Sequence, residues 1–452
     1  MHLVLLSGGS GKRLWPLSND IRSKQFLKLL KNENGQAESM VQRVFRQIKT
    51  VGGWDSVTIA AAASQKDIIN LQLGESVNIV IEPERRDTFP AIALACSYLY
   101  SELMVGRDEV IAVLPVDPYV DLEYFRKISE IENNILEDSD LILLGATPTF
   151  PTEKYGYIVP VYNNFSDPQS AHQHNQKALK VAYFKEKPTV EAAEELINNG
   201  ALWNCGVFGL KLRYVLDILE DKYKISNFSY DSMKETFKSL KKTSFDYEIV
   251  EKAKNIKVLK YEHTWMDLGS WQTVTLEMKN KVEGNVITDD KCTNTHVIND
   301  LELPLVAMGI EDSIIVASCD GILVAKKDVT SRLKEIISDI NYRPMYERKR
   351  WGKYKVLELS PNTLTKKLII EEGKQISYQY HVHRKEIWTI VSGTGLLYLD
   401  GVKRIVSVGD VIRVDEGMKH GIKAVTELEL IEVQIGSILD ETDIIRIEMI
   451  WG

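Results

Sequence analysis

Short apolar runs alternate with segments of mixed polarity over the first third of this 452-residue chain. Ser39–Ile48 carries apolar residues at helical spacing behind a serine that is suited to cap a helix. Alternating strands and helices predict an α/β fold, with a parallel sheet covered by helices on both faces. Ligands of such sheets bind at the carboxyl ends of the strands, so candidate chemistry is expected directly after the apolar runs. The runs that have the length and composition of buried strands are Leu3–Leu6, Val57–Ala61, Val77–Ile81, Val110–Leu114 and Leu141–Ala146.

A glycine-rich loop, Ser7–Gly11, follows the first predicted strand and leads directly into Lys12 and Arg13. Small residues let backbone N–H groups approach an anion, and the two cations neutralise it. The loop is not a Walker A motif, because Arg13 follows Lys12, and Leu14 excludes a dinucleotide fingerprint. A plain strand–turn remains the alternative, but a second basic site at Lys24–Phe26 favours a phosphate-binding loop.

Two later strands also end in candidate ligands. In the stretch Glu82–Ala95, Thr88 and Pro90 open a helix whose N-terminus could hold an anion or a nucleotide, or could simply be capped. Asp117 ends the strand that begins at Val110. A carboxylate at that place can hold a divalent cation, although a helix cap is the plainer alternative.

The second half of the chain changes character. From Gly284 to about Asn341, short β-rich pieces recur at a spacing that resembles a short parallel β-helix, and Arg332–Ile340 is predicted to be a helix. The last hundred or so residues place glycines between short alternating strands, which predicts a small barrel.

A candidate metal site lies in the predicted barrel. Gln379, His381 and His383 are expected on one face of a strand, because side chains alternate along strands. His381 and His383, with Glu386 and the distant His420, form a set of residues that can bind zinc or another divalent transition metal. A metal-free barrel with a structural histidine cluster remains the alternative.

Composition narrows the classes of function. The formal net charge of −8 argues against a broad nucleic-acid surface, though not against a local basic pocket. No apolar run is long enough to span a bilayer, and the first residues lack the features of a signal sequence, so we expect a cytoplasmic protein without a membrane or nucleic-acid partner. The cysteines are widely spaced and are expected to be buried reduced thiols: Cys96, Cys205, Cys292 and Cys319.

The segment Gly8–Ser18, followed by Lys24–Leu27, resembles the signature of the mannose-1-phosphate guanylyltransferases, which belong to the sugar-phosphate nucleotidylyltransferases. The residues near the C-terminus resemble the cupin domain of type II phosphomannose isomerases in four places: Trp351–Gly352, His381–Glu386, Val391–Thr394 and Ile431–Gly436. Further segments that match the transferases in order are Glu82–Ala95, Val110–Pro118, Thr152–Ile158, Tyr183–Pro188, Leu202–Gly209, Ser244–Glu251 and Trp265–Trp271. The positions that depart from the family patterns are Ser23, Asp87, Pro118, Ile387, Asp415 and Gly421.

The resemblance implies three domains. Residues 1–282 would form a Rossmann-like nucleotidyltransferase domain with a mixed or parallel sheet, residues 283–345 a short left-handed β-helix-like segment, and residues 346–452 a cupin β-barrel. The implied reaction is Mg²⁺-dependent transfer from GTP to α-mannose 1-phosphate, giving GDP-mannose and pyrophosphate. The alternatives are a bifunctional enzyme that also interconverts mannose 6-phosphate and fructose 6-phosphate, another pair of NTP and sugar 1-phosphate, and a catalytically silent sugar-nucleotide-binding protein. A homodimer or larger assembly is expected, since strand edges of the β-rich half can pair across subunits.

The resemblance also implies roles for individual residues. Arg13, Lys24, Asp117 and Asp267 would be catalytic, and Asp117 and Asp267 would hold Mg²⁺. The sugar phosphate would contact Gly156, Glu186, Lys187, Asn204 and Asp246. The cupin metal would bind His381, His383, Glu386 and His420. The nucleotide would contact Leu6, Ser7, Gly8, Gly9, Ser10, Gly11, Lys12, Arg13, Glu82, Arg86, Asp87, Thr88, Pro115 and Asp117.

Overall fold

The computed structural model describes residues 1–9, 11–19, 21–135, 139–162, 178–338, 340 and 343–448. The chain divides into two compact units that exchange short segments. The first comprises Met1–Leu14, Ser23–Lys281 and Lys327–Leu333, and the second comprises Trp15–Arg22, Val282–Lys326 and Lys334–Gly452. The predicted boundary at 282/283 is next to one of these crossings, and the predicted three-domain division stays a proposal.

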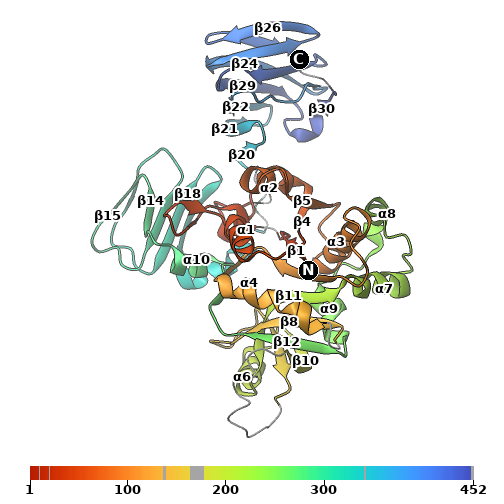
Figure 1. The fold of residues 1–452 in the computed structure, drawn as a ribbon. Coiled ribbons are helices and arrows are strands. Elements are labelled where there is room, and N and C mark those ends of the chain that lie inside the picture. The colour runs from red at the N-terminus through yellow and green to blue at the C-terminus, as the bar shows by residue number, and fades with distance from the viewer. Residues whose placement is uncertain are drawn as a thin grey trace. The chain divides into compact units, whose positions relative to one another are not determined.

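A nine-stranded mixed sheet forms the centre of the first unit (Figure 1). Its strands β1, β4, β5 and β6 are parallel, as the pattern predicts, whereas β11 runs antiparallel to both β6 and β8. The parallel arrangement is interrupted at β11, beyond which β8 and β12 pair in parallel again, so the sheet is mixed. The strands lie in the order β5 (Asn78–Glu82), β4 (Ser56–Ala62), β1 (His2–Leu6), β6 (Val110–Pro115), β11 (Leu202–Lys211), β8 (Leu141–Ala146), β12 (Ile256–Tyr261), β10 (Leu179–Glu186) and β9 (Gly156–Pro160).

The first helix of this unit begins where the sequence predicts a cap. Ser39 accepts a hydrogen bond from the N–H of Gln42 and caps the first helix, which confirms the predicted start. Across the described residues, no helix combines the length and apolar character that crossing a bilayer requires. The helices are α1 (Met40–Val51), α2 (Lys66–Leu73), α3 (Thr88–Ser101), α4 (Leu122–Ser129), α5 (Ile131–Ile135), α6 (Val190–Asn198), α7 (Leu212–Tyr223), α8 (Tyr230–Thr236), α9 (Phe245–Glu248) and α10 (Trp271–Glu277).

A two-stranded ribbon outside the large sheet matters for the site. Strand β7 (Pro118–Val120) pairs antiparallel with β13 (Trp265–Asp267), and Asp267 lies opposite Pro118. Since Asp117 directly precedes β7, this pairing brings two distant aspartates to one place.

The second unit contains stacked short strands, as predicted. Strands β14 (Val282–Gly284), β16 (His296–Asn299) and β18 (Ser313–Ser318) pair in parallel, and so do β15 (Val286–Thr288) and β17 (Leu305–Ala307). Strand β19 (Gly321–Lys326) closes the stack in the antiparallel direction.

The helix predicted for Arg332–Ile340 is wrong in its extent. The structure has a 3₁₀ turn at Lys327–Arg332 and a helix, α11, only at Leu333–Ile336. The Ser338 hydroxyl donates a hydrogen bond to the Glu335 carbonyl, which is a local contact that competes with helix continuation.

The C-terminal strands form the predicted barrel from two sheets, drawn in blue in Figure 1. Buried Trp388, Ile390, Leu397, Ile422 and Leu430 belong to its apolar core. One sheet contains β20 (Tyr346–Lys349), β21 (Gly352–Ser360), β22 (Thr363–Ile370), β29 (Leu428–Gly436), β24 (Arg384–Ser392) and β27 (Val411–Val414). The other contains β26 (Val402–Ser407), β25 (Thr394–Leu399), β28 (His420–Ala424), β23 (Gln379–Tyr380) and β30 (Ile445–Arg446).

The cysteines are free thiols that differ in burial. Cys96 and Cys205 are buried, as predicted, and burial raises the pKa of both thiols. Cys292 and Cys319 are partly exposed, so the expectation of full burial is wrong for these two. Both lie in the stack of short strands, where little of the chain is available to cover a side chain.

Candidate active site

The glycine-rich loop lies at the carboxyl end of β1, as expected. Leu6, the last residue of β1, pairs with Pro115 at the end of β6, so the loop begins beside the approach to Asp117. The Gln25 amide donates to the Ser7 carbonyl at 2.8 Å and thereby anchors the start of the loop. Gly8 and Gly9 are exposed, whereas Ser10 lies outside the described residues. The exposed loop backbone is thus free to approach an anion.

Gly11 permits the two basic segments to meet. A Cβ atom on Gly11 would lie 2.3 Å from the Cα of Ser23 and 2.6 Å from the backbone nitrogen of Lys24. Because these are backbone atoms, room for a Cβ could be made only by moving the chain at Ser23 and Lys24. A residue without a side chain is therefore required for the loop to pack against the segment that carries Lys24.

Lys24 lies between the two predicted magnesium ligands. Its Nζ is 2.8 Å from Asp117 Oδ2 and 3.0 Å from Asp267 Oδ1, and Arg13 Nη1 is 3.9 Å from Asp267 Oδ2. Burial acts to lower the pKa of Lys24, but the two carboxylates outweigh it and raise that pKa above its usual value. Burial acts to raise the pKa of Asp267, and the Lys24 charge reverses the effect, so that pKa is lowered. Lys24 and Asp267 thus stabilise each other's charged forms.

A cavity of about 220 Å³ extends from the aspartates along the first unit. Its wall contains Gly156, Glu186, Asn204 and Asp246, so the structure brings these predicted sugar contacts together. Asn204 donates a hydrogen bond to Asp246 at 2.8 Å. A Cβ on Gly156 would lie 2.4 Å from Glu186 Oε2, so this glycine leaves room for the carboxylate. The volume is below the ~300 Å³ of sites for drug-sized ligands and suits a small polar molecule.

The carboxyl group of Asp246 has an unusual environment. Burial first, and the neighbouring Glu186 charge second, raise the pKa of Asp246 to about 7. Lys187 forms an ion pair with Glu186 at 2.6 Å, and its own backbone has a φ of 47°. A left-handed backbone in a lysine is a strained conformation of the kind that gathers at functional sites.

The predicted nucleotide residues after β5 have partners within the fold. Arg86 pairs with Glu84 at 2.6 Å and donates to the Leu240 carbonyl at 2.9 Å. The Asp87 carboxylate accepts the N–H of Thr88 at the start of α3, and its φ of 71° with ψ of −177° lies in a region that favours glycine. Burial raises the pKa of Glu82 to about 7. These residues do not line the cavity described above, and their contact with a nucleotide stays a prediction.

The sequence prediction missed several residues of the cavity. Lys154, Tyr155 and Trp265 line it, and the Tyr155 ring lies 5.1 Å from that of Trp265. Lys154 and Tyr155 directly precede Gly156 in the matched segment, so adjacency along the chain was the available signal. Cys205 and Gly206 also line the cavity, next to the predicted Asn204.

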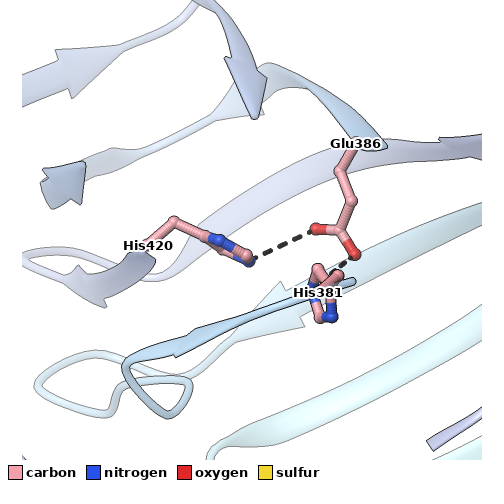
Figure 2. Close-up of side chains that lie close together, drawn as sticks. All are labelled: His381, Glu386 and His420. Atoms are coloured by element: carbon pink, nitrogen blue, oxygen red, sulfur yellow. Dashed lines mark ion pairs between the residues drawn. The ribbon is translucent and has the colours of Figure 1, made fainter. Parts of the chain in front are cut away.

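The barrel holds three of the four predicted metal ligands together. Figure 2 shows His381 and His420 on either side of the Glu386 carboxylate. His381 Nε2 is 3.1 Å and His420 Nε2 is 3.6 Å from that carboxylate. Each histidine Nδ1 lies 2.9 Å from a backbone carbonyl oxygen, that of Asp443 or Met418, which fixes the orientation of the rings.

The prediction that His383 shares this face is wrong. Strand β23 ends at Tyr380 and β24 begins at Arg384, so the alternation of side chains is broken between His381 and His383. The His383 side chain is exposed, and its backbone N–H donates to the Asp443 carboxylate. The side chains that offer ligand atoms to one point are His381, Glu386 and His420.

Arg384 competes with a metal for this cluster. Its Nε donates to Glu386 Oε1 at 3.1 Å, and the Gln434 amide donates to the same oxygen at 3.1 Å. His420 Nε2 is buried and makes no hydrogen bond among the described residues, which fits a metal ligand. The donor types therefore fit a divalent transition metal, on condition that Arg384 moves away from Glu386.

Comparison with known proteins identifies the family. Residues 2–283 match the Nucleotidyl transferase family, and residues 340–449 match the family described as Mannose-6-phosphate isomerase C-terminal. A mannose-1-phosphate guanylyltransferase of Salmonella montevideo is 30% identical over 99% of both chains. The chain belongs to the nucleotidyl transferase family.

A second relative has the same name, and one solved structure shares the fold. A mannose-1-phosphate guanylyltransferase of Escherichia coli K12 is 28% identical over 100% of this chain and 98% of its own. The crystal structure of a mannose-1-phosphate geranyltransferase from Thermus thermophilus aligns with a TM-score of 0.60 at 24% identity, over 75% of this chain and 98% of that one. The latter likeness concerns the fold of the transferase.

Proposed function

We propose that this transferase moves a guanylyl group from GTP to mannose 1-phosphate and releases pyrophosphate. The observation that carries the proposal is the meeting of Asp117 and Asp267 at one cation, Lys24, at the end of a small polar cavity. Relatives that match over nearly the whole chain are named mannose-1-phosphate guanylyltransferases.

The attacking group needs no general base. A phosphate monoester carries close to two negative charges at pH 7, since its second pKa is about 6. Catalysis then rests on aligning two anions and neutralising their charge. Glu186, Asn204 and Asp246 would accept or donate hydrogen bonds to sugar hydroxyls, and Lys187 would hold the sugar phosphate. The amides of Gly8 to Gly11, with Arg13 and Lys24, would neutralise the departing pyrophosphate.

Asp117 and Asp267 would hold Mg²⁺. The observation that fits this assignment is that their oxygens lie 2.8 and 3.0 Å from one ammonium nitrogen, so they already face a common position for a cation. Carboxylate oxygens are the ligands that Mg²⁺ prefers. The bound ion would supply additional positive charge to the phosphates during transfer.

The proposed partners are GTP and the sugar 1-phosphate, and the proposed assembly is a homodimer or larger. Strand β19 ends its sheet and exposes Ile322 and Val324 at 64% and 66%. An edge with exposed β-branched residues is suited to pair across subunits. Light scattering at micromolar concentration that gives the monomer mass would contradict this part.

Pyrophosphate release from four nucleoside triphosphates, each with mannose 1-phosphate and several other sugar 1-phosphates, tests the function. We expect GTP with mannose 1-phosphate to give the highest kcat/KM. Asp87 and Pro118 depart from the family pattern near the nucleotide, so all four bases belong in the panel. A tenfold preference for another nucleotide would overturn the assignment of the base, and the absence of turnover with every pair would overturn the function.

A further inference from the structure

The segment between the two basic elements of the site belongs to the other unit. Arg13 and Lys24 lie in the first unit, whereas Trp15–Arg22, which connects them, lies in the second. Both catalytic cations are therefore within two residues of a segment whose packing partners come from residues after Val282. Contacts that fix this segment therefore also restrict the positions of Arg13 and Lys24, because each is joined to the segment through one intervening residue.

Three contacts fix the segment within the second unit. A Cβ on Gly321 would lie 2.3 Å from the ring of Trp15, so the indole rests directly on the backbone there. The Ser318 hydroxyl donates to the Pro16 carbonyl at 3.1 Å. The Arg22 guanidinium lies 5.6 Å from the centre of the Tyr346 ring.

Asn19 is 2% exposed and has hydrogen-bond partners both within the segment and outside it. Its side-chain oxygen accepts the N–H groups of Ile21 and Arg22, at 3.0 and 2.7 Å, and so shapes the turn that leads to Lys24. Its amide nitrogen donates to Asp320 Oδ2 at 2.9 Å. The two accepted bonds fix which way the amide faces, so only its nitrogen can meet Asp320.

Asp320 joins the segment to two other parts of the second unit. Its Oδ1 accepts the N–H of Met345 at 2.7 Å, and its own N–H donates to the Ser318 hydroxyl at 3.1 Å. Both carboxylate oxygens thus have defined donors, and Asp320 is 9% exposed. Buried groups of this kind are costly to leave unpaired, so the arrangement is specific.

We propose that the hydrogen bond between Asn19 and Asp320 positions Arg13 and Lys24 for binding the phosphates of the nucleotide. Asp320 is then a positioning residue for transfer that lies outside the nucleotidyl transferase match. The proposal rests on the role given above to Arg13 and Lys24. Small displacements of positioning groups cost large factors in rate, which makes the bond testable by kinetics.

Exchanging the two side chains gives a direct test. Asn19→Asp puts a carboxylate against the Asp320 carboxylate. In Asp320→Asn, the new amide nitrogen must face one of two donors, either the Asn19 amide nitrogen or the Met345 N–H. In the double variant, the new carboxylate at position 19 accepts from the backbone and from the new amide nitrogen at position 320. The amide oxygen at position 320 then accepts from Met345. Every hydrogen bond is restored with the partners reversed.

The matched control is Asp312→Asn. Asn294 donates to Asp312 at 2.8 Å, which is an asparagine–aspartate pair in the same unit that is exposed and does not involve the segment. We expect wild-type kinetics from this variant. For each protein, kcat and both KM values are measured, together with the affinity for inorganic pyrophosphate by calorimetry.

Each single variant is expected to lose at least tenfold in kcat/KM for the nucleotide and in pyrophosphate affinity, equivalent to about 1.4 kcal/mol. The KM for the sugar phosphate should stay within twofold, because Glu186, Asn204 and Asp246, which are proposed to contact the sugar, lie on other elements. The double variant should return to within threefold of wild type. Asn19→Ala removes the bond without adding a charge. It replaces a single exchange variant that does not fold, and the same losses are expected from it.

Equal losses for nucleotide and sugar phosphate, no rescue in the double variant, or an equal loss in Asp312→Asn would each overturn the proposal. A drop in unfolding temperature with unchanged kinetics of the folded protein would also overturn it, since the bond would then only stabilise its own unit. Pyrophosphate binding does not depend on the base or the sugar. Its response therefore tests the positioning role even if GTP or mannose 1-phosphate is the wrong substrate.

Discussion

Replacing Asp246 by asparagine should stabilise the first unit above pH 7 while weakening the binding of sugar phosphate. The carboxyl group is half-buried, accepts a hydrogen bond from Asn204 and faces the Glu186 charge, and its pKa is raised from 3.8 to about 7. An amide is neutral at every pH and keeps an oxygen that can accept the Asn204 bond. For the stability of the fold, the substitution therefore removes the cost of ionising a buried carboxyl group and changes little else.

The sign follows from proton binding. The unfolded Asp246 loses its proton near pH 4, whereas the folded one keeps it until about pH 7, so wild-type stability falls as pH rises between these values. A shift of about three pKa units corresponds to about 4 kcal/mol. The cavity is open to solvent, which screens the charge, so we expect about 2 kcal/mol at pH 8 and a difference near zero at pH 4.

Urea unfolding of wild type and Asp246→Asn at pH 4.5, 6, 7 and 8 measures this difference. Glu153→Gln, at an exposed position near the same cavity, is the control and should show no such trend. Asp246→Asn should also raise the KM for the sugar phosphate, because a charged acceptor is lost. A stability difference that is the same at all four pH values would refute the reasoning.

Three further changes have defined outcomes. Asp117→Asn or Asp267→Asn should lower turnover by orders of magnitude, while circular dichroism shows that the fold is intact. Near-normal rates in both variants would contradict the metal assignment. Gly11→Ala should cost about 1–3 kcal/mol in unfolding free energy and weaken nucleotide binding, whereas Gly8→Ala, with no atom within 4 Å of the new Cβ, should leave the unfolding free energy unchanged. Phosphomannose isomerase activity should be weak or absent with Zn²⁺, Mn²⁺ or Co²⁺, because Arg384 competes for Glu386. Fructose 6-phosphate turnover of about one per second or faster would contradict that expectation.

The elements that could be predicted from the sequence are those with a strong local signal. The strand Leu3–Leu6 and the cap at Ser39 follow from apolar runs and a serine, and both are confirmed. The sequence also predicted that the glycine loop and Asp117 lie close together, because the carboxyl ends of parallel strands lie at the same edge of a sheet. These arguments need only short windows of sequence.

Features that depend on tertiary contacts could not be predicted. The alternation rule placed His383 with His381, but a break between two strands overrides it. Nothing in the local sequence around Asn19 indicates that it pairs with a residue 301 positions away. Likewise, the antiparallel course of β11 depends on its neighbours in the sheet, and the composition of a strand does not encode its direction.

The ribbon of β7 and β13 has a consequence for the order in which the site comes into existence. Lys24 and Asp267 are 243 positions apart, and β13, which carries Asp267, pairs with β7 beside Asp117. During synthesis from the N-terminus, the glycine loop, Lys24 and Asp117 all emerge long before the second aspartate. A nascent or prematurely terminated chain that lacks β13 can thus fold much of its sheet and still have only half of the carboxylate pair. The carboxylate pair that we propose for transfer can therefore be complete only after all strands of the large sheet have been synthesised.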